Sequence, residues 1–161
     1  MGFSVVIDTN IFIEICNVQE NFWECLPVIS KIKEGKIIIA VDTNGDILKE
    51  YLDALKKNMN NPIAKIILEL IKKEIYKQSG PTIFKSYVPV RLNKLRPLIN
   101  MGFHNDDVKF VRIANQTDLM TIISIDSRSF FSDNYASWIR DNLSVDAMRP
   151  CSFIAFFSNL V

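Results

Sequence analysis

The stretch FSVVID at residues 3–8 decides the fold, because a short, mostly apolar run of strand-forming residues ends at an acidic side chain. Such a run, without regular polar alternation, is typical of a strand buried on both faces. Comparable runs recur as KIIIAV at 36–41 and LMTIISI at 119–125, and SVDAM at 144–148 is a shorter candidate. Strands buried on both faces belong to parallel sheets that helices cover on each side.

The segments between these strands show the spacing of amphipathic helices. Residues 11–33 are expected to be helical, with Thr9 or Asn10 capping the start. Pro27 is expected to break or kink this region, or to lie near the start of a new turn. Further helices are expected after the cap-type residues 42–44, at 63–77, near 91–100, from about 106 to 115, at 135–143 and from Pro150 onward. Strands that alternate with helices predict an α/β fold, a three-layer sandwich around a mostly parallel sheet of four or five strands.

The length and charge of the chain limit what it can be. A chain of 161 residues suits one domain, here 1–161, in which 58–100 forms a longer helical and irregular insertion. A formal net charge of +1 excludes a strongly basic protein that wraps nucleic acid through many phosphate contacts. It leaves room for an enzyme with a local basic rim.

Cysteine usage and hydropathy give the compartment that we expect. The cysteines Cys16, Cys25 and Cys151 are odd in number and form no CxxC pair, and His104 is the sole histidine. This pattern predicts neither a disulfide framework nor a zinc site, so a reducing cytoplasm is the expected location. No signal peptide and no apolar run of 18 or more residues is visible, so no contact with a membrane is expected.

Acidic residues stand at the predicted strand ends. Asp8 follows SVVI and Asp126 follows IISI, and ligands of open α/β sheets bind outside the carboxyl ends of the strands. The doublet Asp106–Asp107 opens a predicted helix, and Glu50 lies one turn into another. Each position also has a local explanation, since acidic residues cap helices, favour their positive ends or face solvent. Spacing alone leaves both interpretations open.

Four blocks together give the chain a resemblance to the PIN-domain nucleases over nearly its whole length. They are VVIDTNIFIEI at 5–15, DILKEYLDAL at 46–55, NDDVKFVRIAN at 105–115 and MTIISIDSRSF at 120–130. A closing segment, MRPCSFIAFF at 148–157, resembles the ending of a bacterial, toxin-like branch. The chain departs from the family in three places: Phe130 stands four residues after Asp126 instead of three, Ser124 replaces a frequent Thr, and 58–100 is longer.

The resemblance implies a metal-dependent endoribonuclease that cuts single-stranded RNA with water activated by Mg²⁺ or Mn²⁺. Asp8, Glu50, Asp107 and Asp126 would be the catalytic metal ligands, and Asp106 an alternative or supporting ligand. Hard oxygen donors of this kind suit either ion. Asn10 and Ser124 would hydrogen-bond the carboxylates or a metal-held water. Arg128 and His104 would contact substrate.

Alternative functions and partners remain open from the sequence. A phosphatase of the haloacid-dehalogenase type would need an Asp at the position of Asn10, and a receiver domain would need its acidic pair near the first strand. The stronger alternative is a PIN-fold module that binds nucleic acid or protein without cleaving. DNA is a second candidate substrate. A neutralising antitoxin-like protein and a second copy of the chain are candidate partners, and the helix at 62–78 is a candidate surface for them, with core packing as its other use.

Overall fold

The computed structural model describes residues 2–76 and 82–160 and contains a sheet of five strands that pair in parallel. The strands are β1 (Phe3–Ile7), β2 (Ile37–Asp42), β3 (Phe84–Tyr87), β4 (Thr121–Ile123) and β5 (Asp146–Met148). Their order across the sheet is β3-β2-β1-β4-β5. The predicted α/β fold with a parallel sheet is therefore confirmed.

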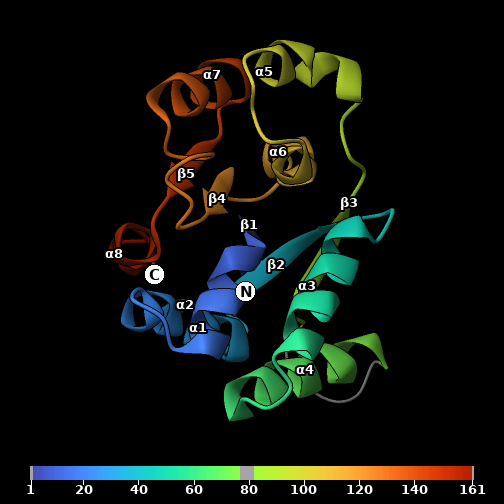
Figure 1. Ribbon diagram of the computed structural model, residues 1–161, viewed down its shortest axis with the longest axis vertical. Helices are drawn as coiled ribbons and strands as arrows, with labels where there is room; N and C mark the ends of the chain where they lie inside the picture. Colours follow the sequence, from blue (N-terminus) through green and yellow to red (C-terminus); the bar gives the residue numbers. More distant parts are fainter. Residues whose placement is uncertain (1, 77–81, 161) are drawn as a thin grey trace.

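Helices cover both faces of the sheet, which gives three layers (Figure 1). One side carries α1 (Thr9–Asn17), α2 (Phe22–Lys33), α3 (Asp46–Lys57), α4 (Pro62–Ile75) and α8 (Pro150–Ser158). The other carries α5 (Arg96–Asn100), α6 (Val108–Ala114) and α7 (Asp133–Leu143), with short 3₁₀ turns at Leu92–Leu95 and Asn105–Asp107. None of the helices within the described ranges is long and apolar enough to cross a membrane.

The chain reverses its direction of travel across the sheet beside β1. From β1 it proceeds outward through β2 to β3, and then returns to the other side of β1 to form β4 and β5. In an open α/β sheet the crevice at such a reversal, outside the carboxyl ends of the strands, is the usual ligand site. Asp8 directly follows β1, and Asp126 comes three residues after the end of β4.

Three local predictions were wrong. The insertion expected at 58–100 contains the helix expected near 91–100, but it also contains the edge strand β3, whose polar sequence FKSY hid it from a search for apolar runs. The helical region 11–33 breaks between α1 and α2, where Val18 adopts a left-handed backbone, while Pro27 lies inside α2. The cap of α1 is Asp8 itself, because its carboxylate accepts a bond from the amide of Asn10.

The core fixes α3 firmly against the sheet. Ile47, Tyr51 and Leu55 recur at helical spacing along one face of α3 and are fully buried. The hydroxyl of Tyr51 donates a hydrogen bond to the main-chain carbonyl of Ile7, the last residue of β1. A buried phenol needs such a partner, and here the bond ties α3 to the strand that carries Asp8.

Helix α4, the candidate partner surface, has two different faces. Ala64, Ile67, Leu68 and Ile71 are buried, as core packing requires. Ile66 and Ile75 are 54% and 47% exposed. Scattered exposed apolar side chains are common on protein surfaces, so the use of this face by a partner stays a prediction.

Candidate active site

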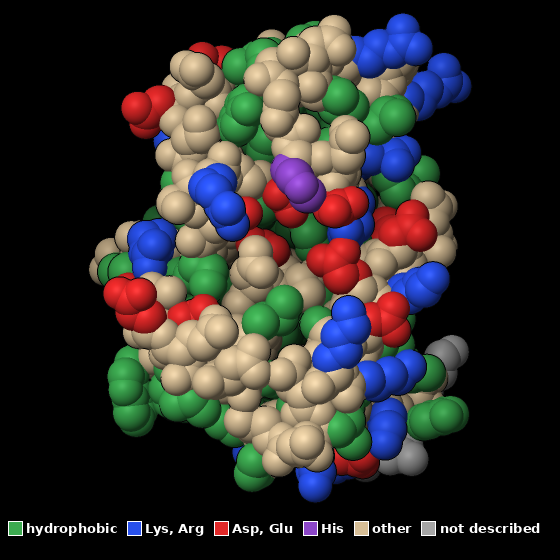
Figure 2. Space-filling model, in the orientation of Figure 1, with side chains coloured by type: hydrophobic (Ala, Val, Ile, Leu, Met, Phe, Trp, Pro, Cys, Tyr) green, Lys and Arg blue, Asp and Glu red, His purple; other side chains and the backbone are tan. Residues whose placement is uncertain are grey.

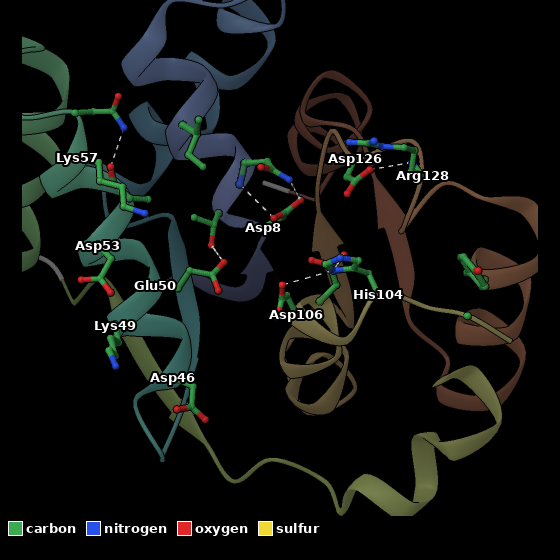
Figure 3. Close-up of a pocket in the computed structure, with 18 residues that line it drawn as sticks. Asp8, Asp46, Lys49, Glu50, Asp53, Lys57, His104, Asp106, Asp126 and Arg128 are labelled. Atoms are coloured by element: carbon green, nitrogen blue, oxygen red, sulfur yellow. Dashed lines mark hydrogen bonds and ion pairs between the residues drawn. The ribbon is translucent and has the colours of Figure 1, made fainter. Parts of the chain in front are cut away.

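A cavity of about 920 Å³ opens between α3, the segments that follow β1 and β4, and the turn before α6. Figure 2 shows acidic side chains gathered beside the histidine in the middle of this face, with basic side chains around them. Figure 3 shows how these side chains surround the cavity. Its acidic and basic lining residues are Asp8, Asp46, Lys49, Glu50, Asp53, Lys57, His104, Asp106, Asp107, Asp126 and Arg128. All five acidic residues singled out in the sequence, from four separate segments, therefore line one cavity.

Asp8 is the most buried of these acidic residues, with only 2% of its surface exposed. Its carboxylate accepts bonds from the Ser124 hydroxyl at 2.6 Å, from the Asn10 amide at 3.2 Å and from the Asn10 side chain at 3.3 Å. Desolvation raises the pKa of Asp8 to about 6, against these bonds, and the negative charge of Asp107 adds to the rise. The donors are neutral, so they orient the carboxylate without balancing its charge.

Asp107 and Asp106 occupy different environments. The Asp107 side chain is 14% exposed, whereas that of Asp106 is 84% exposed. Burial raises the pKa of Asp107, the nearby Ser129 hydroxyl opposes this rise, and the charge of Asp126 reinforces it. Asp8, Asp107 and Asp126 line the same cavity, so the negative charge of each raises the cost of ionising its neighbours. Of the two, Asp107 is therefore the one whose carboxylate is shielded from solvent, as that of Asp8 is.

Ser124 connects the two strand ends. Its hydroxyl accepts the amide of Asp126 at 3.0 Å and donates its proton to Asp8 at 2.6 Å. A hydroxyl has one proton to donate and can also accept. Because the Asp126 amide is the donor in its bond to Ser124, the hydroxyl proton remains available for Asp8. The Asp126 carboxylate in turn accepts the main-chain amide of Arg128 at 2.8 Å. This bond fixes the backbone of Arg128 beside the cavity, and Arg128 is itself exposed.

Glu50 has both carboxylate oxygens engaged. Oε1 accepts the hydroxyl of Thr9, and Oε2 forms an ion pair with the ammonium of Lys109 from α6. The exposed fractions of the Glu50 and Lys109 side chains are 35% and 21%, so the pair is partly shielded from water. Glu50 is thus balanced by a cation, in contrast to Asp8.

His104 lies at the rim with a largely exposed side chain. Its Nδ1 is 3.8 Å from a carboxylate oxygen of Asp106 and 4.0 Å from one of Asp107. These distances are too long for direct hydrogen bonds. The imidazole is close to the carboxylates and accessible from solvent, as its predicted contact with substrate requires.

Sequence reasoning missed several residues in or beside the cavity. Thr9 was expected to cap a helix and Lys109 was given no role, but both contact Glu50. The exposed residues Asp46, Lys49, Asp53 and Lys57 line the cavity. Their spacing from Glu50 along α3 could have placed them on its face. Lys109 carried no such signal, because its contact joins segments 59 residues apart in the chain.

The carboxylates suit a hard divalent cation by their chemistry, since Mg²⁺ and Mn²⁺ prefer oxygen ligands. Asp8 supports the fit, because its buried charge lacks an ion-pair partner among the residues that the structure describes. Within the same residues, however, no three His, Cys, Asp or Glu side chains are already arranged as a metal site. The carboxylates are therefore ligands of the right chemical type and line one cavity. Binding of an ion would require Glu50 to rearrange, because both of its carboxylate oxygens already have partners.

Comparisons of the chain with protein-family models, curated proteins and solved structures returned no significant match. The resemblance to PIN-domain nucleases accordingly stays a prediction from four sequence blocks. What the structure itself provides is a parallel α/β fold with a cavity at its strand-reversal point, lined by acidic side chains from four segments.

Proposed function

We propose that the protein is a metal-dependent nuclease that hydrolyses phosphodiester bonds, with single-stranded RNA as the preferred substrate. The observation that carries this proposal is the meeting of Asp8, Glu50, Asp107 and Asp126 around one cavity at the carboxyl end of the sheet. Carboxylates so placed repel one another and resist burial, so they are costly unless a cation binds them. The choice of RNA rests on the family resemblance alone.

The four carboxylates would hold Mg²⁺ or Mn²⁺, with Asp8 as the anchor because three hydrogen bonds fix its orientation. The ion, when bound, would lower the pKa of a water and polarise a phosphoryl oxygen. Ser124 and Asn10 would keep Asp8 in place through the bonds that they already donate. Asp106 would remain at the exposed rim and add negative charge to the ligand set.

Arg128 and His104 would hold the substrate at the rim. Both line the cavity, and both side chains are exposed. Within the described ranges, Arg128 forms no ion pair, so its guanidinium is available to bind a phosphate. His104 can donate to a phosphate or stack on a base. These contacts would position the scissile bond above the buried carboxylates.

The test is cleavage of a set of single-stranded RNAs by the full chain with Mn²⁺, and then with EDTA. We expect cleavage that EDTA abolishes and excess Mn²⁺ restores. Asp8→Asn should lose this cleavage and should also lose any rise of the melting temperature caused by Mn²⁺. Asp141→Asn, at an exposed position of α7, serves as the control and should behave as wild type.

A module that binds nucleic acid or protein without cutting is the second candidate. The observation in its favour is that, within the described residues, no metal-ready group is formed and Glu50 is paired with Lys109. Such a module would bind RNA without EDTA-sensitive cleavage, and Asp8→Asn would leave its affinity for RNA unchanged. Finding both results together would replace the nuclease proposal.

A further inference from the structure

Lys109 occupies a position between the two sides of the candidate active site. Its ammonium contacts Oε2 of Glu50 on α3 and donates a bond of 2.6 Å to the main-chain carbonyl of Asp106, just before α6. It also lies 5.1 Å from the centre of the Phe110 ring, a cation–π distance. One partly buried cation is thus held by three groups.

The position of this ammonium matters because of what surrounds it. Glu50 and Asp107 both line the cavity, and the charge of Lys109 lowers the pKa of Asp107 against the rise caused by burial. A cation already present among candidate ligands neutralises part of the charge that would attract a metal ion. It also blocks Oε2 of Glu50, while Thr9 occupies Oε1.

We propose that Lys109 is an internal counter-cation that holds Glu50 in the metal-free protein and competes with the divalent ion for it. This inference rests on the proposed metal site and adds a residue outside the predicted ligand set. Lys109 acts through Glu50 and is therefore a positioning residue. Binding of the ion releases the ammonium from Glu50, so metal affinity is set by this exchange as well as by the carboxylates.

The exchange makes an unusual prediction for Lys109→Met. Loss of the ion pair leaves Glu50 without its cation, so the metal-free variant should melt at a lower temperature than wild type. Loss of the competitor should at the same time tighten Mn²⁺ binding, by roughly tenfold for a charge removed from beside a divalent ion. A purely structural defect would lower stability and weaken binding together, so opposite changes distinguish the two roles.

The experiment is titration calorimetry of the metal-free full chain with Mn²⁺, accompanied by melting curves with and without the ion. Lys109→Arg keeps the charge and should bind Mn²⁺ as wild type does. Lys49→Met is the matched control: Lys49 lines the same cavity but has an exposed side chain and no ion pair among the described residues. Its substitution should change the Mn²⁺ affinity by less than about threefold, as expected for a screened charge.

A double-mutant cycle with Glu50→Gln tests the route of the effect. If Lys109 acts through Glu50, Lys109→Met should no longer tighten Mn²⁺ binding once Glu50 is Gln. Unchanged or weaker binding by Lys109→Met, with wild-type binding intact, overturns the counter-cation role and leaves the metal site standing. Absence of Mn²⁺ binding in both proteins overturns the site and the inference together. Binding that appears only in Lys109→Met supports the inference in its strongest form.

Should Lys109→Met fail to fold, Lys109→Gln provides the same loss of charge with a polar side chain. The expected direction is the same: a lower melting temperature without metal and tighter Mn²⁺ binding. Equal affinity of the Gln variant and wild type would overturn the proposal.

Discussion

Two aspartates at opposite ends of β1, Asp8 and Asp118, each accept a hydrogen bond from a serine, yet their environments shift their pKa values in opposite directions. Asp118 lies beside the start of β1 and accepts the Ser4 amide at 2.8 Å, the Ser4 hydroxyl at 2.7 Å and the Lys85 ammonium at 3.2 Å. Desolvation acts to raise the pKa of Asp118, but these donors outweigh it and hold that pKa below its usual value. Asp8 has only neutral donors and stronger burial, and its pKa rises to about 6.

The difference separates a structural carboxylate from a candidate functional one. Asp118 is compensated by a lysine and stabilises the fold when ionised. Asp8 is held in position by hydrogen bonds, but its ionised form is destabilised by burial. Strongly perturbed carboxylates in a cavity are typical of functional sites, because a ligand can supply the compensation that the protein withholds.

The largest expected effect concerns cleavage. Asp8→Asn should reduce Mn²⁺-dependent RNA cleavage by about 100-fold or more, a loss typical when a preorganised electrostatic group is removed from an active site. Asp118→Asn should leave the rate close to that of wild type, since it lies at the other end of β1. Single-turnover cleavage rates of both variants measure the contrast. Equal rates for Asp8→Asn and wild type would show that Asp8 has no role in cleavage and does not differ functionally from Asp118.

The second effect concerns the stability of the metal-free protein. The pKa of Asp8 is raised from 3.8 to about 6, so folding favours its protonated form, and stability falls as pH rises through about 6. At about 1.4 kcal/mol per pKa unit, Asp8 costs about 3 kcal/mol at neutral pH. Asp8→Asn should therefore unfold at higher urea concentration than wild type at pH 7.5, and the gain should vanish near pH 4. A gain that is the same at both pH values would contradict the assigned pKa.

Asp118→Asn should show the opposite sign and a smaller size. The folded pKa of Asp118 is lowered, so its contribution to stability is present above the unfolded pKa and disappears as pH falls through the folded one. The side chain is 38% exposed, and solvent screening limits its ion pair with Lys85. We expect a loss of about 1 kcal/mol at pH 7.5 in urea unfolding, mainly from weaker bonds to Ser4. A stabilised Asp118→Asn variant would show that the two aspartates are alike.

The smallest effect compares the two serines. Ser124→Ala removes a bond that lowers the pKa of Asp8, so the pH at which metal-free stability falls should move upward. Mn²⁺ affinity should decrease by several-fold, as happens when a group that orients a metal ligand is lost. Ser4→Ala should cost about 1 kcal/mol of stability and leave Mn²⁺ affinity unchanged. Calorimetry and urea unfolding of the pair separate these outcomes.

The sequence predicted the layers of the fold and most of its elements because buried strands and amphipathic helices leave strong periodic patterns. It could not predict β3, whose pairing with β2 depends on an edge position and not on apolar residues. It also misplaced the break between α1 and α2, since a proline was the visible signal and the actual break lies at Val18. These misses concern tertiary context, which overrides local preference.

In the candidate site, too, the sequence predicted some features and missed those that depend on tertiary contacts. The predicted acidic residues all line one cavity, because Asp8 and Asp126 follow strands while Glu50, Asp106 and Asp107 lie on or just before helices that pack beside them. The bond from Thr9 and the ion pair of Lys109 with Glu50 could not be predicted, since they depend on how α1, α3 and α6 meet in space. The balance of charge inside the cavity is therefore known only from the folded chain.

The Tyr51 bond to Ile7 has a consequence for protein engineering. It anchors α3 to β1, with Ile47 and Leu55 packed on either side, so the contacts that fix this helix to the core come from its inner residues. Asp46, Lys49, Asp53 and Lys57 all lie on the outer, exposed part of α3 that borders the cavity (Figure 3). The charged residues on the outer face of α3 can therefore be substituted without repacking the interior, which makes this face suitable for redesigning substrate preference.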